Sequence, residues 1–310
     1  MSRSSAYENV GASKDAIQHH YDVGNALYER FLGPTMAYSA GIWRDPPARD
    51  TLDEAQNRKL DWHIDWMGAA TARRVLDVGC GWGSLIKRLA TRKPDAEVVG
   101  LTMSDAQAAY LRQSVGSRAE VAVMPWQKYE SNRPFDCITC IEAIEHFADL
   151  KLTREQRIQA YRDFFDFCAR HLVPGGRVTL QMTTWNNVLP GEEKNYEFGN
   201  FFPNSCLPHV PDLVAAADGL FHVVRLEVSA RDFICTLREW LKTLRRDEAA
   251  LKREFGSDLI EWYKANFTTV LVAFRSGVIT LSRMALEKRG PTLAWDRQIV
   301  GLEPRARAEA

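Results

Sequence analysis

Apolar and polar residues alternate in blocks through the middle of the chain, and the blocks predict strands and helices in turn. Five short apolar runs have the length of strands buried in a parallel sheet; they span 74–78, 97–101, 119–123, 135–141 and 176–182. The intervening segments show helical spacing, over 83–91, 105–114 and 155–171. This alternation predicts an α/β fold with a doubly wound, mainly parallel sheet.

The flanking segments follow a different pattern. Residues 1–70 are rich in aromatics and mostly helical in pattern, and Thr51 and Glu54 have capping-box spacing. We interpret 1–70 as a helical cap and 71–185 as the core. Residues 186–290 begin with a long loop, 186–208, typical of a functional lid.

The rest of the lid region contains regular elements. A strand is expected at 221–229, helices at 231–246 and 247–276, and a last strand at 278–285, before a polar tail, 291–310. Pro174-Gly175-Gly176 predicts the turn that ends the helix over 155–171. The helices and the lid would cover the carboxyl edge of the sheet, where such folds bind ligands, within one compact domain.

Composition is that of a globular protein in water. Of 310 residues, 45% are hydrophobic and 26% charged, and 40 Lys+Arg balance 40 Asp+Glu, so no basic field favours nucleic acid. No apolar run approaches the ~18 residues of a membrane span. Met1 to Ala6 lack the apolar core of a signal peptide. We expect a cytoplasmic protein that could touch a membrane surface only transiently; its oligomeric state stays open.

The six cysteines include a C-x-x-C pair, Cys137 and Cys140. Both lie in a predicted strand, where a separation of three directs side chains to opposite faces. We therefore expect reduced, buried thiols and no metal site.

A glycine-rich turn follows the first predicted strand. Asp77 precedes Gly79, Gly81 and Gly83, which are spaced G-x-G-x-G, whereas a dinucleotide fingerprint would be G-x-G-x-x-G. An acid at the turn suits a ligand with a cationic end, and S-adenosylmethionine (SAM) carries a sulfonium and an amino group. We expect Gly79 and Gly81 to have no room for a Cβ beside that ligand. The alternative is an ordinary βα turn.

Two further positions would contact such a ligand. Thr102 ends the second predicted strand, about 20 residues after the turn, where a ribose-binding Asp or Glu is usual. Trp126 follows the third strand and could stack on adenine or pack in the core.

Short motifs in a fixed order identify a family resemblance from about residue 18 to residue 290. They are His20-Tyr21-Asp22, Pro34-Thr35-Met36-Ala37-Tyr38-Ser39, Thr51-Leu52-Asp53-Glu54-Ala55-Gln56, Asp77-Val78-Gly79-Cys80-Gly81-Trp82-Gly83, Gly100-Leu101-Thr102-Met103-Ser104, Glu145-His146-Phe147 and Phe202-Pro203-Asn204. The chain resembles the cyclopropane fatty acid synthases, including the mycolic acid cyclopropane synthases.

The resemblance implies a Rossmann-like class I SAM methyltransferase fold and a set of SAM contacts. These are Tyr38, Ser39, the glycine turn, Thr102, Met103, Gln107, Trp126 and Gln127.

The resemblance also implies a bound bicarbonate that acts as base, held by a Cys, a Glu, a His and a Tyr. Glu145 keeps the Glu, but the other three positions are Ala40, Gln181 and Phe233. We therefore expect bicarbonate dependence to be weak and the product to carry a methyl group rather than a cyclopropane ring.

Candidate acid–base residues follow the fourth predicted strand. They are Glu142, Glu145 and His146, and Tyr21 in the cap is a fourth catalytic candidate. One helical turn would place Glu142 beside His146, and histidine can take a proton near neutral pH. Glu145 could instead be a surface acid, and His146 could cap or pack at a helix start. A similar Glu-x-x-Glu-His grouping occurs in plant benzylisoquinoline N-methyltransferases, which resemble the same family.

Aromatic residues are dense in the cap and lid; they are Tyr21, Tyr38, Trp43, Trp185, Tyr196, Phe198, Phe201 and Phe202. They favour a hydrophobic substrate, a lipid chain or an isoprenoid- or polyketide-like metabolite. We predict SAM-dependent methyl transfer to an alkene carbon of such a substrate. The alternatives are N-methylation of a hydrophobic amine and true cyclopropanation of an unsaturated acyl chain.

Two other classes fit less well. A SAM-binding module without catalysis would not need Glu145 and His146, and a nicotinamide dehydrogenase would have the other glycine spacing.

Overall fold

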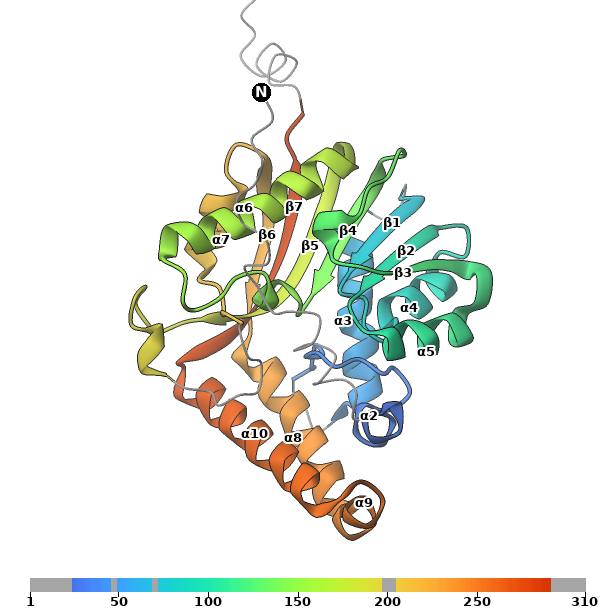
Figure 1. The fold of residues 1–310 in the computed structure, drawn as a ribbon, viewed down its shortest axis with the longest axis vertical. Coiled ribbons are helices and arrows are strands. Elements are labelled where there is room, and N and C mark those ends of the chain that lie inside the picture. Colours follow the sequence, from blue (N-terminus) through green and yellow to red (C-terminus); the bar gives the residue numbers. More distant parts are fainter. Residues whose placement is uncertain (1–23, 46–48, 69–71, 197–204, 291–310) are drawn as a thin grey trace, which may run out of the picture.

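A seven-stranded sheet forms the centre of the molecule, in a computed structural model that describes residues 24–45, 49–68, 72–196 and 205–290 (Figure 1). Its strand order is β3-β2-β1-β4-β5-β7-β6. The strands are β1 (Arg74–Val78), β2 (Glu97–Thr102), β3 (Ala119–Val123), β4 (Phe135–Ile141), β5 (Leu172–Trp185), β6 (Phe221–Val228) and β7 (Ile279–Lys288). Strands β1 to β5 run parallel, and β7 pairs antiparallel with β5 and β6. The predicted fold class is confirmed.

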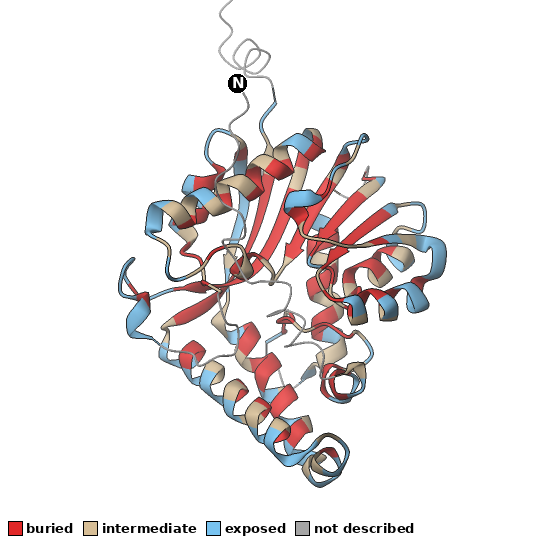
Figure 2. Ribbon diagram, viewed as in Figure 1, coloured by how far each residue is buried: buried red, intermediate tan, exposed pale blue. Residues whose placement is uncertain are grey.

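Helices cover both faces of this sheet (Figure 1). One face carries α3 (Leu52–Trp66), α4 (Ser84–Arg92) and α5 (Asp105–Val115), and the other carries α6 (Arg154–His171) and α7 (Val210–Ala217). The strands between them are mostly buried, apart from the two edge strands β3 and β6 (Figure 2). Each face therefore has its own apolar core.

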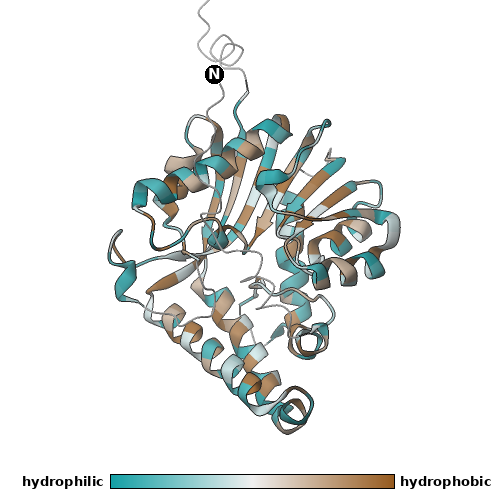
Figure 3. Ribbon diagram, in the orientation of Figure 1, coloured by the Kyte–Doolittle hydropathy of each residue, from teal (hydrophilic) through white to brown (hydrophobic). Residues whose placement is uncertain are grey.

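A helical arm extends from the carboxyl edge of the sheet (Figure 1). It consists of α2 (Asn25–Leu32), α8 (Ala230–Arg246), α9 (Glu248–Phe255) and α10 (Ser257–Ser276). Hydrophobic and hydrophilic surfaces alternate around α8 and α10 (Figure 3). Their apolar sides form a third core with α2, in which Tyr38 stacks on Trp240 at 5.3 Å between ring centroids.

The predicted capping box starts α3. Thr51 Oγ1 accepts from Glu54 N at 3.2 Å, and Glu54 Oε2 accepts from Thr51 N at 2.8 Å. These bonds satisfy backbone donors that the first helical turn leaves unpaired.

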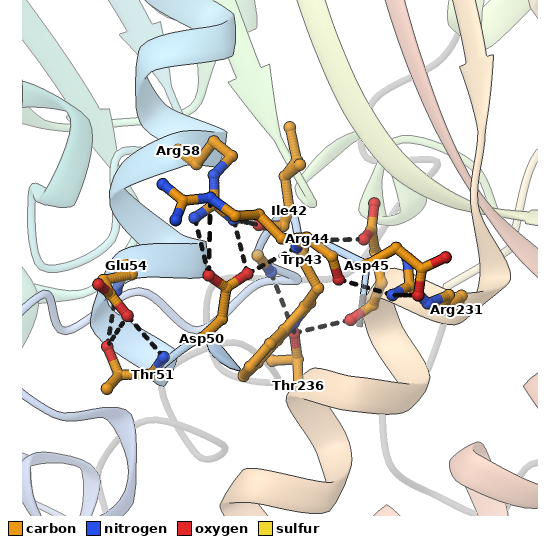
Figure 4. A network of polar contacts seen from close by, with 12 residues as sticks. Ile42, Trp43, Arg44, Asp45, Asp50, Thr51, Glu54, Arg58, Arg231 and Thr236 are labelled. Carbon is orange, nitrogen blue, oxygen red and sulfur yellow. Dashed lines mark hydrogen bonds and ion pairs between the residues drawn. The ribbon is translucent and has the colours of Figure 1, made fainter. Parts of the chain in front are cut away.

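Polar contacts then tie the segment before α3 to the start of α8 (Figure 4). Trp43 Nε1 donates to Thr236 Oγ1 at 3.0 Å, and Arg231 contacts Asp45 at 3.0 Å. The segment that leads from Tyr38 to Trp43 is thereby held between α3 and α8, against the edge of the sheet.

Two local predictions were wrong, and one helix was missed. The helix expected over 247–276 breaks at Gly256, whose φ of 93° suits glycine and separates α9 from α10. Helix α7, eight residues long, was not predicted. The 174–176 turn does not end α6, which stops at His171; it forms an irregularity inside β5.

The C-x-x-C pair lies as expected. Cys137 packs in the core under α3 to α5, and Cys140 packs in the core under α6. All six cysteines are buried and free. The division into cap, core and lid stays a prediction. Across the described ranges, no helix is both long and apolar enough to cross a membrane.

Candidate active site

A pocket opens at the carboxyl ends of β1 and β4. Its lining is Met36, Tyr38, Ser39, Asp77, Gly79, Cys80, Gly81, Trp82, Ser84, Leu85, Gln107, Ile141 and Glu142. Predicted cofactor residues from three separate segments of the chain thus meet one candidate acid–base residue, Glu142.

The glycine turn shapes the floor of this pocket. Gly79 and Gly81 have φ values of 79° and 54°. A Cβ on Gly79 would lie 2.5 Å from Cβ of Ala143, whereas a Cβ on Gly81 would meet nothing within 4 Å. Gly79 is confined by the protein itself, whereas Gly81 borders open space, so the expectation that a bound ligand leaves no room for a Cβ at Gly81 stays a prediction. Gly83 is confined by Leu111.

Asp77 supplies a carboxyl group at the same turn. It is 3% exposed, and Thr139 Oγ1 donates to its Oδ1 at 2.9 Å. Burial raises the pKa of Asp77 to about 6. The open space at Gly81 and the carboxyls of Asp77 and Glu142 fit SAM, whose sulfonium and amino group are cationic.

Thr102 and Gln107 meet where β2 ends. Thr102 Oγ1 donates to Gln107 Oε1 at 2.8 Å and accepts from Ser104 N at 3.2 Å. Met103 is half-buried between them. Only Gln107 of these lines the pocket, so the SAM contacts of Thr102 and Met103 stay predictions.

Trp126 lies in an aromatic core. It is 8% exposed, and its ring centroid is 5.4 Å from those of Phe147, Phe164 and Phe167. Gln127 is exposed. The core placement foreseen as the alternative holds for Trp126, and adenine stacking stays a prediction.

Glu142 follows β4 and is half-buried. Its Oε1 accepts from Ala40 N at 2.8 Å and from Gln181 Nε2 at 2.7 Å. Desolvation raises the pKa of Glu142, and these two donors with the charges of Lys59 and Arg283 oppose that rise. Two positions of the altered anion site, Ala40 and Gln181, therefore contact Glu142.

The third altered position, Phe233, does not contact Glu142 through a polar group. Phe233 is 8% exposed and packs in the arm against Phe274, at 4.8 Å between ring centroids. It adds an apolar surface.

Sequence reasoning missed a buried set of charges beneath the pocket. Arg283 is 1% exposed; it donates to Gln181 Oε1 at 2.7 Å, Asp232 Oδ2 at 2.8 Å and Gly41 O at 3.1 Å. A charged residue flanked by Leu281 and Met284 within the final predicted strand was the available signal.

Lys59 is the second missed cation. It is fully buried, and its Nζ donates to Ser39 Oγ at 2.8 Å. Burial lowers the pKa of Lys59, while the carboxyls of Glu142 and Asp77 act to raise it. It lies on the apolar face of α3 between Ala55 and Leu60, a position where a lysine is unusual.

Glu145 is a buried acid. It is 7% exposed, its Oε1 accepts from Thr183 N at 2.8 Å, and its Oε2 has no hydrogen-bond partner among the described residues. Burial and the charge of Glu142 raise the pKa of Glu145 to about 8. The surface-acid alternative is wrong, and Glu145 carries a proton at neutral pH.

His146 ends a 3-10 turn, Ile144–His146. Glu142 has a φ of 50°, so residues 142–146 do not form the α-helical turn expected to bring the two side chains together. His146 Nδ1 lies 2.6 Å from Ser205 Oγ, and burial lowers the pKa of His146 to about 4. The ring is neutral at neutral pH.

The other aromatic candidates differ in how far they are buried. Trp43 and Trp185 are buried, whereas Tyr196 is 37% exposed beside Trp185. Tyr21, Phe198, Phe201 and Phe202 lie outside the described residues.

Comparison with known proteins identifies the family. The family model described as mycolic acid cyclopropane synthetase matches residues 9–284. The chain belongs to this family. Two relatives are a methoxy mycolic acid synthase, MmaA3 of Mycobacterium tuberculosis, 30% identical with 88% of this chain and 95% of the relative covered, and the hydroxymycolate synthase MmaA4 of Mycobacterium bovis, 31% identical with 75% and 78% covered.

Solved structures of cyclopropane synthases have the same fold as this chain. The cyclopropane synthase MmaA2 from Mycobacterium tuberculosis matches with a TM-score of 0.78 and 25% identity, covering 91% of this chain and all of that one (100%). The mycolic acid cyclopropane synthase CmaA1 complexed with SAH and CTAB matches with a TM-score of 0.78 and 28% identity, covering 90% and 99%.

These findings confirm four predictions: the family, the class I methyltransferase fold, a methyltransferase activity and SAM as cofactor. This member of the family is thus a SAM-dependent methyltransferase.

Proposed function

We propose that this methyltransferase transfers the methyl group of SAM to an alkene carbon of a hydrophobic substrate, a lipid chain or an isoprenoid- or polyketide-like metabolite. The observation that carries the proposal is the carboxyl group of Glu142, which follows β4 and borders the pocket; the buried acid Glu145 stands three residues further along the chain. The relatives named above are named for mycolic acids, which supports a lipid-like substrate.

An alkene nucleophile makes specific demands. When bound, SAM supplies an electrophilic methyl on a sulfonium. A new bond from an alkene carbon to that methyl leaves positive charge on the neighbouring carbon, and a proton must then leave to restore a neutral product.

Glu142 meets both demands. Its carboxylate borders the pocket, with one oxygen fixed by Ala40 N and Gln181 Nε2. A fixed negative charge stabilises positive charge that develops nearby, and the same carboxylate can accept the departing proton. The rings of Tyr38 and Trp82 in the lining add faces that attract a cation.

Glu145 and His146 have different roles in this proposal. Glu145 is protonated at neutral pH, so it can lose that proton only when positive charge comes near its unpaired oxygen. His146 is neutral and a weak base, and its Nδ1 is hydrogen-bonded to Ser205 Oγ.

Simple methylation is favoured over ring closure. A cyclopropane ring requires a base that removes a proton from the transferred carbon itself. The positions Ala40 and Phe233 supply no polar side chain to hold a mobile base beside the new methyl group, and Gln181 is already bonded to Glu142, whose carboxylate is tethered to the chain.

The test measures SAH formed from SAM with three probes: dioleoyl phosphatidylglycerol vesicles, geranyl diphosphate and a tetrahydroisoquinoline amine. We expect SAH and a methylated product with at least one alkene, and turnover lowered by about a hundredfold or more in Glu142→Gln. Methylation of the amine alone would overturn the proposal in favour of N-methylation.

A further inference from the structure

The donors at the altered anion site converge on one atom of the chain itself. Ala40 N and Gln181 Nε2 both donate to Glu142 Oε1, at 2.8 and 2.7 Å. Gln181 Nε2 also donates to Ala40 O at 3.0 Å, so both of its N–H groups are already bonded to acceptors within the chain. A bicarbonate at these two positions would have to displace a carboxylate of the same charge, and it therefore does not fit.

We propose that Glu142 is a built-in anion, a covalently attached carboxylate that fills the place of a free small carboxylate and serves as the base of the reaction. This inference rests on the proposed function and adds that the reaction needs no bicarbonate. In the proton-transfer step, a C–H bond of the cationic substrate breaks, its electron pair forms the new C=C bond, and the proton ends on Glu142.

Backbone geometry supports the assignment. Glu142 has a φ of 50°, in the left-handed region that disfavours residues with a Cβ. Among the described residues that carry a Cβ, only Met36, with a φ of 51°, also has a positive φ, and it lines the same pocket. Strain of this kind, about 1–2 kcal/mol, persists where surrounding contacts hold the residue, and it is common at functional sites.

Buried charge beneath the pocket opposes the rise that desolvation causes in the pKa of Glu142. Arg283 is paired with Asp232 at 2.8 Å and also bonds Gln181 Oε1, so the Gln181 amide must present its N–H groups to Glu142. Lys59, which is fully buried, adds a further cation whose electrostatic field acts on Glu142.

The first experiment measures anion binding without any substrate. Wild type, Glu142→Gly and Glu142→Gln are each saturated with SAH, and their thermal unfolding is followed with rising sodium bicarbonate, and with sodium formate in parallel. Sodium chloride at equal ionic strength is the control for salt. Glu142→Gly removes the carboxylate and relieves the strained φ, whereas Glu142→Gln keeps the space filled.

The expected result is a rise in Tm with bicarbonate or formate for Glu142→Gly alone, because an anion that binds only the folded chain stabilises it. Equal response of wild type and Glu142→Gly would overturn the inference, as would no response in Glu142→Gly. If Glu142→Gly does not fold, Glu142→Ala takes its place, with the same outcomes.

The second experiment separates this inference from the proposed function. With the alkene probe that gives turnover, bicarbonate should restore activity to Glu142→Gly by about tenfold or more and leave Glu142→Gln unchanged. Turnover of the wild type should not change in degassed buffer, and a collapse that bicarbonate restores would overturn the inference. Failure of every alkene probe would count against the proposed function, while the anion-binding result would still decide the assignment of Glu142.

Discussion

The guanidinium of Arg283 fixes which end of the Gln181 amide faces the pocket. Arg283 Nε donates to Gln181 Oε1 at 2.7 Å, so the amide nitrogen points the other way, to Glu142. A cation that never borders the pocket thereby orients a donor that does.

The first prediction tests this relay through Gln181→Leu. Loss of the amide removes a donor from Glu142, so the pKa of Glu142 should rise further and the acidic limb of the rate–pH profile should move to higher pH. Buried Arg283 Nε would also lose its partner, at a cost of about 1–3 kcal/mol in unfolding free energy.

The control for that variant is Gln159→Leu, the same replacement at an exposed position of α6. It should leave both the pH profile and the stability close to those of the wild type. An unshifted profile in Gln181→Leu, with stability lowered, would assign Gln181 a structural role only.

The second prediction concerns Glu145→Gln. Gln cannot ionise when positive charge develops, so turnover should fall by roughly a hundredfold while SAM affinity, measured by calorimetry, changes little. Parallel losses of stability and of activity would instead support a purely structural Glu145.

The third prediction concerns the pH dependence of stability. The pKa of Glu145 is about 8 in the folded chain against an ordinary value of 4.5, so the folded chain binds more protons between these values. Stability from this group is complete below about pH 4.5 and is lost as the pH rises through about 8. The unfolding free energy of Glu145→Gln, measured in urea relative to that of the wild type, should rise by at least ~1 kcal/mol as the pH goes from 5 to 9.

Glu120→Gln is the matched control, because Glu120 is exposed on the edge strand β3. Its stability difference from the wild type should stay flat over the same pH range. A flat difference for Glu145→Gln as well would show that its carboxyl is not buried in protonated form.

The fourth prediction separates cofactor binding from folding at the glycine turn. Gly81→Ala places a methyl in open space of the pocket and should weaken SAM binding by about tenfold or more. Its Tm should fall only slightly, because the one cost to folding is the backbone strain of an alanine at a positive φ. Gly116→Ala is the matched control, since Gly116 has a φ of 58° and open surroundings at the end of α5. Equal SAM affinity in both variants would place the ligand elsewhere.

Much of the fold follows from local pattern. The buried strands are short apolar runs, the first turn is marked by Gly79, Gly81 and Gly83, and β4 leads directly to Glu142 and Glu145. These features depend on neighbours in sequence, and so the sheet and the edge that carries the site could be predicted.

The chemistry of the site depends on contacts between distant segments. Glu142 and Ala40 are 102 residues apart in sequence, and so are Arg283 and Gln181. Those pairs are set by the packing of the arm and by the register of β5 against β7, neither of which local periodicity encodes. For the same reason Lys59, on a helix that looks amphipathic, was not expected under the pocket.

The count of deuterium in the product tests the central claim most directly. With SAM that carries a fully deuterated methyl group, transfer to an alkene carbon followed by proton loss from the substrate to Glu142 keeps all three deuteriums, and NMR of the product shows the new methyl on carbon. Ring closure must lose one deuterium from the transferred carbon. A product with three deuteriums in a carbon-bound methyl is the predicted result; a product with two would contradict the account and assign this chain to cyclopropane formation.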